Sequence, residues 1–530
     1  MTIWLVSREY AGIAEAGGVK NVACSLCENL VRLGQKVMLF IPKYCCSDLS
    51  KLQSYKENFV RSSYISVCGK TEEIKYDYGM LNGVEIIFIS HPAFSEKKGV
   101  YTYTKEEEES NTTHKRGLGH KDSLFLNVLF QMAVVKFSEQ SSPEESPDII
   151  HCQDATTALV PVFVEDFLQK SMIAKIVFSH TKCIVTIHNA GPGYHHEFTD
   201  IEQAKYYTSL PKKILEKGLC GTSVEPFLLS TLNAKLTTVS PEYAEEILNG
   251  TTETAGLSEA FRFRHINILG ITNGIDFEKY DPSDVKKSTL PFAFNPIKKQ
   301  LVGKYECRRA FLERFSIANK NNNSLENIEQ FGYIETGLAS DPCEPVFVAY
   351  HGRIVRQKGI DVLVEAADIF LKKDSPVRFI IMGQGEPELE NKISLLSIKY
   401  PGKCIFFKGY DKSLTRLCTA VSDFIALPSN FEPCGLEDFI AQIFGTLPVA
   451  HATGGLCKIV DDQTGFLYKP NTAEELSKTI SNLVKLKQAD SDIFNNMISY
   501  AADYVRSNYS WRIVTKEKYL EMYKSLLSKG

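Results

Sequence analysis

The sequence predicts an α/β protein made of two doubly wound domains. Two series of short apolar segments alternate with stretches of helical periodicity, and the second series begins after Asn273-Gly274-Ile275-Asp276. Such alternation is typical of parallel sheets covered by helices. The length of 530 residues also favours two domains, because single hydrophobic cores stop growing at about 250–300 residues. We expect the two domains to face an interdomain cleft in which the carboxyl ends of the strands bind ligands.

The first series opens with a clear strand–loop–helix–strand unit. Residues 3–6 are apolar like a buried strand, and residues 10–18 form a loop that contains glycine. Apolar residues then recur at helical spacing from Val19 until Gly34 ends the helix. Further strands are expected at residues 37–41, 84–90, 148–151 and 183–187, and a strand at 236–239 is expected to close the first half.

The second series predicts a second sheet and leaves two long segments as loops. Its strands are expected at residues 346–350, 377–382, 404–407, 423–427 and 447–450. Residues 104–122 carry an acidic run at 106–109, and residues 319–343 contain few large apolar side chains. Both segments are expected to be solvated surface loops without chemistry.

The composition is that of an ordinary globular protein, with 44% hydrophobic and 23% charged residues. A net charge of −4 gives no sign of nucleic-acid or membrane binding. No run approaches 18 apolar residues, so neither a membrane span nor a signal peptide is expected. The 14 scattered cysteines favour buried thiols in a reducing cytoplasm. Cys24 and Cys27 have no second pair at metal spacing, so we expect neither a metal site nor a cofactor.

Residues 429–456 are the most informative stretch of the chain. The apolar run 424–427 predicts a buried strand that delivers Glu432 onto a loop. Gly435 in that loop lets the backbone approach a ligand closely, just before a helix begins near Leu436. Unpaired N–H groups at a helix start suit phosphate. A carboxylate beside such a cradle indicates a nucleotide-sugar transferase, although the turn alone also fits an ordinary strand–turn–helix.

Two cations lie at the expected ligand edge of the second sheet. The strand at 346–350 leads into His351-Gly352-Arg353, and Lys358 follows on the next loop. Arginine and lysine can stabilise a departing nucleoside diphosphate without a bound metal ion. A pair of unrelated surface cations is the alternative. Gly383, in Gly383-Gln384-Gly385, follows the next strand and fits close packing at least as well as ligand contact.

Three segments of the second half resemble one enzyme family. Glu432-Pro433-Cys434-Gly435-Leu436, followed by Gly445-Thr446-Leu447-Pro448 and Thr453-Gly454-Gly455-Leu456, resembles the signature of bacterial glycogen synthases and plant starch synthases, family 5 of the glycosyltransferases. The segments around Arg353 and Lys358 are similar to the family's donor-binding motif. The resemblance runs from residue 3 to residue 523. It implies the GT-B fold of two Rossmann-like domains: an acceptor-side domain at 1–270, a nucleotide-sugar-binding domain at 273–504, and a final helix, 505–530, that crosses back.

The resemblance also implies roles for individual residues. The catalytic residues would be Glu432, Arg353 and Lys358. Donor binding is implied for Cys434, Gly435, Leu436, Thr453, Gly454, Gly455, Gly383 and, in the first loop, Glu15, Gly17 and Gly18. The acceptor or sugar side would be formed by Asp154, Thr156, His188 and Asn189. Asp411 would lie in the loop that contacts the base.

Several positions depart from the family pattern, chiefly in the first half. Relatives carry a lysine at the position of Glu15 and a histidine at that of Thr156. Gln153 and Ala155 also differ, as do Asn430, Glu437 and His451 in the second half. Inverting the charge at Glu15 costs diphosphate binding unless a cation intervenes or the loop points away. The donor half is therefore expected to be intact and the acceptor half altered.

We expect a cytoplasmic hexosyltransferase of the glycogen/starch synthase type. It would transfer glucose from ADP-glucose to the non-reducing end of an α-1,4-glucan with retention of configuration, and it would bind neither nucleic acid nor membrane. Two alternatives stay open because of the altered first half. One is a transferase that uses another nucleotide sugar, such as UDP-glucose, or another acceptor. The other is a degenerate synthase that acts as a non-catalytic binding or regulatory protein. The sequence leaves the oligomeric state open.

Overall fold

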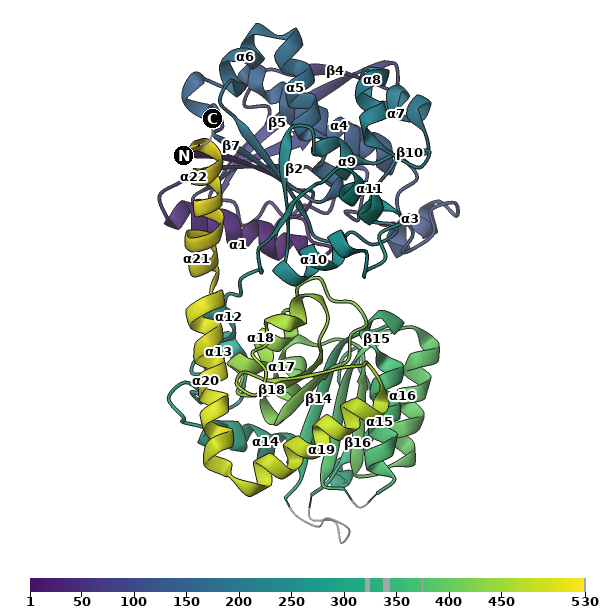
Figure 1. The fold of residues 1–530 in the computed structure, drawn as a ribbon, viewed down its shortest axis with the longest axis vertical. Helices are drawn as coiled ribbons and strands as arrows, with labels where there is room; N and C mark the ends of the chain where they lie inside the picture. The colour runs from purple at the N-terminus through teal and green to yellow at the C-terminus, as the bar shows by residue number, and fades with distance from the viewer. Residues whose placement is uncertain (320–324, 337–343, 374, 529–530) are drawn as a thin grey trace. The chain divides into compact units, whose positions relative to one another are not determined.

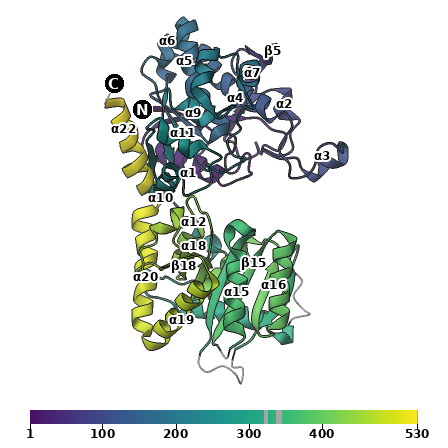
Figure 2. The same cartoon turned by 45° about the vertical axis from the view of Figure 1, so that its right-hand side comes forward.

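The computed structural model describes residues 1–319, 325–336, 344–373 and 375–528 (Figure 1). The chain divides into two compact units. Unit 1 contains Met1–Gly274 and Trp511–Gly530, and unit 2 contains Ile275–Ser510. Each unit has a mainly parallel sheet with helices packed on it, so both are doubly wound α/β structures (Figures 1 and 2). No helix in the described ranges combines the length and apolarity needed to cross a bilayer.

The sheet of unit 1 has the order β12-β11-β8-β7-β1-β2-β6-β5-β3, and β4 pairs with β5. Its parallel strands are β1 (Thr2–Val6), β2 (Lys36–Pro42), β6 (Val84–Ser90), β7 (Ile149–Gln153), β8 (Lys182–Ile187), β11 (Ala234–Thr238) and β12 (Ile268–Gly270). The antiparallel edge is formed by β3 (Ser54–Lys56), β4 (Ser63–Val67) and β5 (Lys70–Leu81), and a separate short hairpin by β9 (Leu219–Cys220) and β10 (Ser223–Val224). The predicted strands of this half are confirmed. The expectation that residues 236–239 close the first half was wrong, because β12 pairs beyond β11.

The antiparallel edge escaped prediction because its strands are only half buried. In β4, buried and exposed residues alternate. Such a strand lacks the continuous apolar run of a buried parallel strand. The expected loop at 104–122 was also partly wrong, since α3 (Lys105–Ser110) is a helix. Thr104 and Glu107 form a reciprocal capping box that stabilises it.

The remaining helices of unit 1 cover both faces of the sheet. They are α1 (Val19–Arg32), α2 (Pro92–Ser95), α4 (Ser123–Lys136), α5 (Val160–Lys170), α6 (Met172–Phe178), α7 (Ile201–Thr208), α8 (Lys212–Leu215), α9 (Pro226–Ser230), α10 (Pro241–Asn249) and α11 (Leu257–Phe263). The chain returns to unit 1 at α21 (Trp511–Val514), which continues through a π-helical turn into α22 (Leu520–Ser528) beside α1 (Figure 1). Trp511, Tyr519 and Tyr523 form a buried apolar face on this segment.

The sheet of unit 2 has the order β13-β16-β15-β14-β17-β18-β19. Its strands are β13 (Glu329–Ile334), β14 (Val346–Ile354), β15 (Val377–Gly385), β16 (Lys403–Lys408), β17 (Phe424–Leu427), β18 (Leu447–His451) and β19 (Phe466–Tyr468). All are parallel except β13. The five predicted strands are confirmed. The loop expected at 319–343 was wrong at β13, and its residues 320–324 and 337–343 lie outside the described ranges.

The helices of unit 2 pack around one large apolar core and two smaller apolar clusters. They are α12 (Phe277–Tyr280), α13 (Val285–Ser288), α14 (Val302–Arg314), α15 (Ile360–Leu371), α16 (Pro387–Lys399), α17 (Lys412–Val421), α18 (Glu437–Ile443), α19 (Ala473–Ala489) and α20 (Ser491–Tyr509). In the expected crossing helix at 505–530, residues 505–509 are the last part of α20 and belong to unit 2. The chain passes to unit 1 at Trp511.

Candidate active site

The candidate site of unit 2 lies where the strand order reverses. From β14 the chain runs outward through β15 and β16, and then β17 pairs on the other side of β14. Doubly wound sheets bind ligands at the carboxyl ends of the strands beside such a switch point. The segments at that point are residues 351–359, which comprise the end of β14 and the turn after it, and residues 428–436, which follow β17.

Glu432 and Lys358 form an ion pair across this switch point. Ser429 Oγ donates a second hydrogen bond to Glu432 Oε2, at 3.3 Å. The backbone of Glu432 is held as well, because its carbonyl accepts a hydrogen bond from the Gly455 amide at 2.8 Å. The structure therefore brings together the predicted carboxylate, one predicted cation and the glycine turn that follows β18.

Arg353 is the exposed cation of this group. It forms no ion pair within the described ranges, and its Nη2 donates to Gln357 Oε1 at 3.2 Å. Gln357 in turn donates to the carbonyl of Phe431 at 3.2 Å. The guanidinium is thus anchored to the Glu432 loop while its charge stays available to an anion.

The carboxylate of Glu437 lies beside an imidazole. Its Oε2 lies 3.0 Å from His351 Nδ1, at the end of β14. Burial by itself raises the pKa of Glu437, but the hydrogen bond and charge of His351 outweigh it and lower the pKa. Glu437, which departs from the family pattern, therefore has a hydrogen-bonding partner at the end of β14.

The glycines of the signature segment are explained by close packing. A Cβ on Gly455 would lie 2.2 Å from the Cys434 carbonyl oxygen. Gly435 has a φ of +72°, which disfavours a side chain. A Cβ on Gly383 would lie 2.0 Å from the Gly352 carbonyl oxygen, so Gly383 is explained by contact between β14 and β15.

The remaining predicted positions of unit 2 hold the loops together. Asn430 Nδ2 donates to the Arg356 carbonyl at 3.0 Å, and the carbonyl of Asn430 lies 3.5 Å from Thr453 Oγ1. His451 Nδ1 lies 2.8 Å from the carbonyl oxygen of Ser429. These departures from the family pattern thus join the loop after β17 to its neighbours without exposing a new charge.

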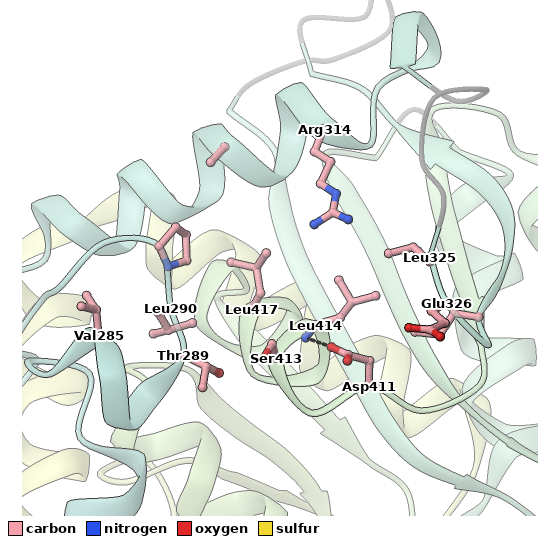
Figure 3. A pocket seen from close by; sticks show the side chains of 13 residues that line it. Val285, Thr289, Leu290, Arg314, Leu325, Glu326, Asp411, Ser413, Leu414 and Leu417 are labelled. Carbon is pink, nitrogen blue, oxygen red and sulfur yellow. Dashed lines mark hydrogen bonds between the residues drawn. The ribbon is translucent and has the colours of Figure 1, made fainter.

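Asp411 lies beside a cavity of about 590 Å³ whose walls are mostly apolar (Figure 3). Its carboxylate caps α17 by accepting a hydrogen bond from the Leu414 amide at 2.7 Å. Leu290, Leu325 and Leu417 line the cavity around it. The described contacts therefore give Asp411 a capping role, and its expected role toward a base stays a prediction.

In unit 1 the corresponding switch point lies between β1 and β7. Glu9, a residue that the sequence analysis did not assign to the site, is buried there directly after β1. Its Oε2 accepts hydrogen bonds from the amides of Ala16 and Gly17, at 3.0 and 2.6 Å. Burial is the main cause that raises the pKa of Glu9. The signal available in the sequence was a carboxylate placed immediately after a buried strand.

Glu15 and Lys20 form an ion pair within the first loop, with 2.8 Å between Oε2 and Nζ. Glu15 Oε1 also accepts a hydrogen bond from the Gly12 amide at 2.7 Å. The hydrogen bond from Lys20 is the main cause that lowers the pKa of Glu15. The inverted charge is therefore compensated from the first turn of α1. Gly18 has a φ of −80°, and a Cβ there would meet no atom within 4 Å.

Asp154 follows β7 with unusual backbone angles, φ 68° and ψ 176°. Such strain in a residue other than glycine concentrates at functional sites. Its Oδ1 accepts a hydrogen bond from the His188 amide at 3.3 Å. Burial raises the pKa of Asp154 to about 7, against the opposing effect of backbone amides that include those of His188 and Asn189.

The histidine after β8 and its neighbours complete this group. His188 Nε2 lies 2.8 Å from Gln153 Oε1, and burial lowers the pKa of His188 to about 4. Asn189 Oδ1 accepts a hydrogen bond from the Gly191 amide at 2.8 Å. Thr156 is buried in the short helical turn after Asp154. The polar groups that the sequence predicted are therefore adjacent in unit 1.

His151 has a structural role. Its ring nitrogens lie 2.8 Å from the Tyr523 hydroxyl and 2.7 Å from Thr186 Oγ1. The residue is fully buried, and burial lowers the pKa of the imidazole to about 3. His151 therefore ties β7 to the returning helix α22.

Comparisons with known proteins identify the family. Residues 2–262 match the family model described as starch synthase catalytic domain, and residues 340–503 match that of glycosyl transferases group 1. Glycogen synthase from Thermodesulfovibrio yellowstonii is 28% identical over 551 residues, which cover 99% of this chain and 98% of the relative. Glycogen synthase from Vibrio parahaemolyticus is also 28% identical, and the match covers 100% and 99% of the two chains.

The chain belongs to the glycogen and starch synthase family. Its fold is similar to the solved catalytic domain of starch synthase IV from Arabidopsis thaliana, bound to ADP and acarbose. That match has a TM-score of 0.78, 23% identity and 99% coverage of both chains. The GT-B class expected from the sequence is confirmed, and the chain is a glycosyltransferase of this family.

Proposed function

We propose that this family member transfers glucose from ADP-glucose to the non-reducing end of an α-1,4-glucan in the cytoplasm, with retention of configuration. One observation carries the proposal: Glu432 is fixed by Lys358 at the switch point of unit 2, beside Arg353, which has no ion-pair partner in the described ranges. Arg353 and Lys358 would hold the diphosphate, and Glu432 would orient the hydroxyls of the donor sugar. These cations would stabilise the leaving group without a metal ion.

The polar group of unit 1 would serve the sugar and the acceptor. Asp154 and His188 offer a carboxyl and a neutral imidazole at the carboxyl ends of β7 and β8. Such groups form hydrogen bonds with hydroxyls. This assignment supports an acceptor rich in hydroxyl groups, as an α-glucan is.

A second candidate is a binding protein that has lost transfer activity. It is favoured by Glu15, because the family's lysine is absent there and the only cation that contacts Glu15 in the described ranges is Lys20, which Glu15 neutralises. A third outcome is transfer from UDP-glucose instead of ADP-glucose.

One assay separates these possibilities. Purified protein is mixed with ADP-glucose or UDP-glucose, with and without glycogen, and the released diphosphate is measured. Release that depends on glycogen and on ADP-glucose supports the proposal, and release only from UDP-glucose changes the donor. Absence of turnover with either donor, together with nucleotide binding in equilibrium dialysis, would establish the binding protein.

A further inference from the structure

Lys458 places a buried ammonium directly beneath the signature segment. Its side chain is 2% exposed, and it follows the Gly454-Gly455 turn after β18. Lys458 was not among the predicted site residues, although a lysine between Cys457 and Ile459 is visible in the sequence. Nζ donates to the carbonyl oxygens of Cys434 at 2.6 Å, Gly435 at 3.1 Å and Gly455 at 2.9 Å, and to Asp438 Oδ1 at 2.9 Å.

One ammonium therefore joins three segments that meet at the candidate donor site. Cys434 and Gly435 belong to the loop after β17, Gly455 to the turn after β18, and Asp438 to α18. Asp438 balances the charge, because an unpaired ammonium would be strongly unfavourable in a buried position. The ring of Phe439, centred 4.5 Å from Nζ, closes the remaining side.

The carbonyl contacts also determine where the loop amides point. A carbonyl and the next residue's N–H lie in one planar trans peptide and point in opposite directions. Because the carbonyls of Cys434 and Gly435 point at Lys458, the N–H groups of Gly435 and Leu436 point away from it. Within the described ranges, neither of these two amides has an acceptor.

We propose that Lys458 is a positioning residue for donor binding, which holds the amides of Gly435 and Leu436 toward the diphosphate of the nucleotide sugar. This inference rests on the proposed function. Lys458 itself does not touch the donor; it acts by orienting the two peptide planes and by fixing the turn at Gly455 against them. Backbone amides that are held in place before binding stabilise an anion without a reorganisation cost.

The chain contains a matched control for a buried lysine. Lys304 Nζ donates to the carbonyl oxygens of Ala420, Ser422 and Phe444, and to Thr446 Oγ1, at 2.6 to 3.3 Å. Lys304 is equally buried in unit 2, but its partners precede β17 and β18, at the opposite edge of the sheet. Replacing it removes the same kind of interaction without touching the donor loops.

The test compares Lys458→Met with Lys304→Met in the full chain. In Lys458→Met the carboxylate of Asp438 is left buried without its counter-ion. The double variant Lys458→Met/Asp438→Asn removes this carboxylate, so that a folded protein is available for the comparison. ADP and UDP binding is measured by calorimetry on folded protein, and amide hydrogen exchange is followed in peptides covering residues 432–440 and 452–458. The KM for the nucleotide sugar and kcat are measured separately.

For both Lys458 variants we expect faster exchange in these two peptides and diphosphate binding weakened at least about tenfold, with the main effect on KM. Lys304→Met should leave exchange in these peptides and binding by the folded protein unchanged.

Unchanged exchange and binding in the folded Lys458 variants would overturn the inference, and so would equal losses in Lys304→Met. Wild-type protein that binds neither ADP nor UDP would overturn the proposed function and, with it, the assignment of these amides to a diphosphate. Normal wild-type binding with an unaffected Lys458 variant would refute the positioning role alone.

Discussion

The Lys20 ammonium lies 2.8 Å from Glu15 Oε2, so the loop in which the family carries a lysine instead contains a closed ion pair. The two side chains come from opposite ends of the Gly17-Gly18 turn, and Glu15 also holds the Gly12 amide. The first loop therefore still has a cation, Lys20, near the position at which the family carries its lysine, but Glu15 compensates the charge of Lys20.

Replacing Glu15 by lysine should raise transfer activity if this loop reaches the phosphates. The change removes a carboxylate and leaves two cations in the turn, and a charge-assisted contact to phosphate contributes about 1.5–3 kcal/mol, which corresponds to roughly tenfold or more in affinity. The measurement is kcat/KM with ADP-glucose and glycogen. Asp166→Asn, which breaks the exposed pair with Lys170 in α5, is the control and should change nothing. Unaltered or reduced activity in Glu15→Lys would mean that Glu15 has become part of a different site.

Arg353→Ala should weaken nucleoside diphosphate binding by about 10- to 100-fold, since it removes a charge-assisted contact worth about 1.5–3 kcal/mol. Arg356→Ala is the matched control, because Arg356 is a nearby exposed cation that pairs with Glu388 at 3.2 Å. Calorimetry with ADP measures both. Equal losses in the two variants would show that only the general positive charge of the loop matters.

Gly455→Ala should abolish nucleotide binding in folded protein, because its Cβ would lie 2.2 Å from the Cys434 carbonyl oxygen and force the two donor loops apart. Gly119→Ala has no atom within 4 Å of the added methyl group and serves as the control. Circular dichroism establishes folding, and equilibrium dialysis with ADP measures binding. Normal dialysis results for a folded Gly455→Ala would show that this contact does not shape the site.

The buried pair of His195 and Glu225 should make unfolding depend on pH above neutrality. Its atoms Nδ1 and Oε2 are 3.0 Å apart. Burial by itself lowers the pKa of His195, but the hydrogen bond and charge of Glu225, with a contribution from Glu197, raise it to about 9. The folded state then binds more protons than the unfolded state between about pH 6.5 and 9. The contribution of this pair to the free energy of unfolding is therefore fully present below pH 6.5 and declines as the pH rises toward 9.

Urea unfolding at pH 6, 7.5 and 9 tests this dependence. We expect the midpoint of wild type to fall across the series, whereas His195→Asn should be less stable at pH 6 and show a flatter series. A wild-type midpoint that stays constant from pH 6 to 9 would contradict the protonated state of His195.

Much of the fold could be predicted because buried parallel strands have continuous apolar runs. The strands that end at Val6 and Leu427, and the helix that starts at Val19, were all visible in this way. The antiparallel strands β5 and β13 were not predicted, because their buried residues are interrupted by exposed or half-buried ones. The partner of β13, β16, is also remote in sequence.

The candidate site, like the fold, has features that could be predicted from the sequence and features that could not. The sequence alone determined the family, the residue types at the donor loops and the inverted charge at Glu15, since these depend on local order along the chain. Only the tertiary structure decided which side chain each of these carboxylates meets: Glu15 meets Lys20, Glu437 meets His351, and Asp438 meets Lys458. The partners of Glu437 and Asp438 come from other elements that are remote in the sequence. A buried charge is tolerated only where folding brings its counter-ion and the surrounding carbonyls within hydrogen-bond distance.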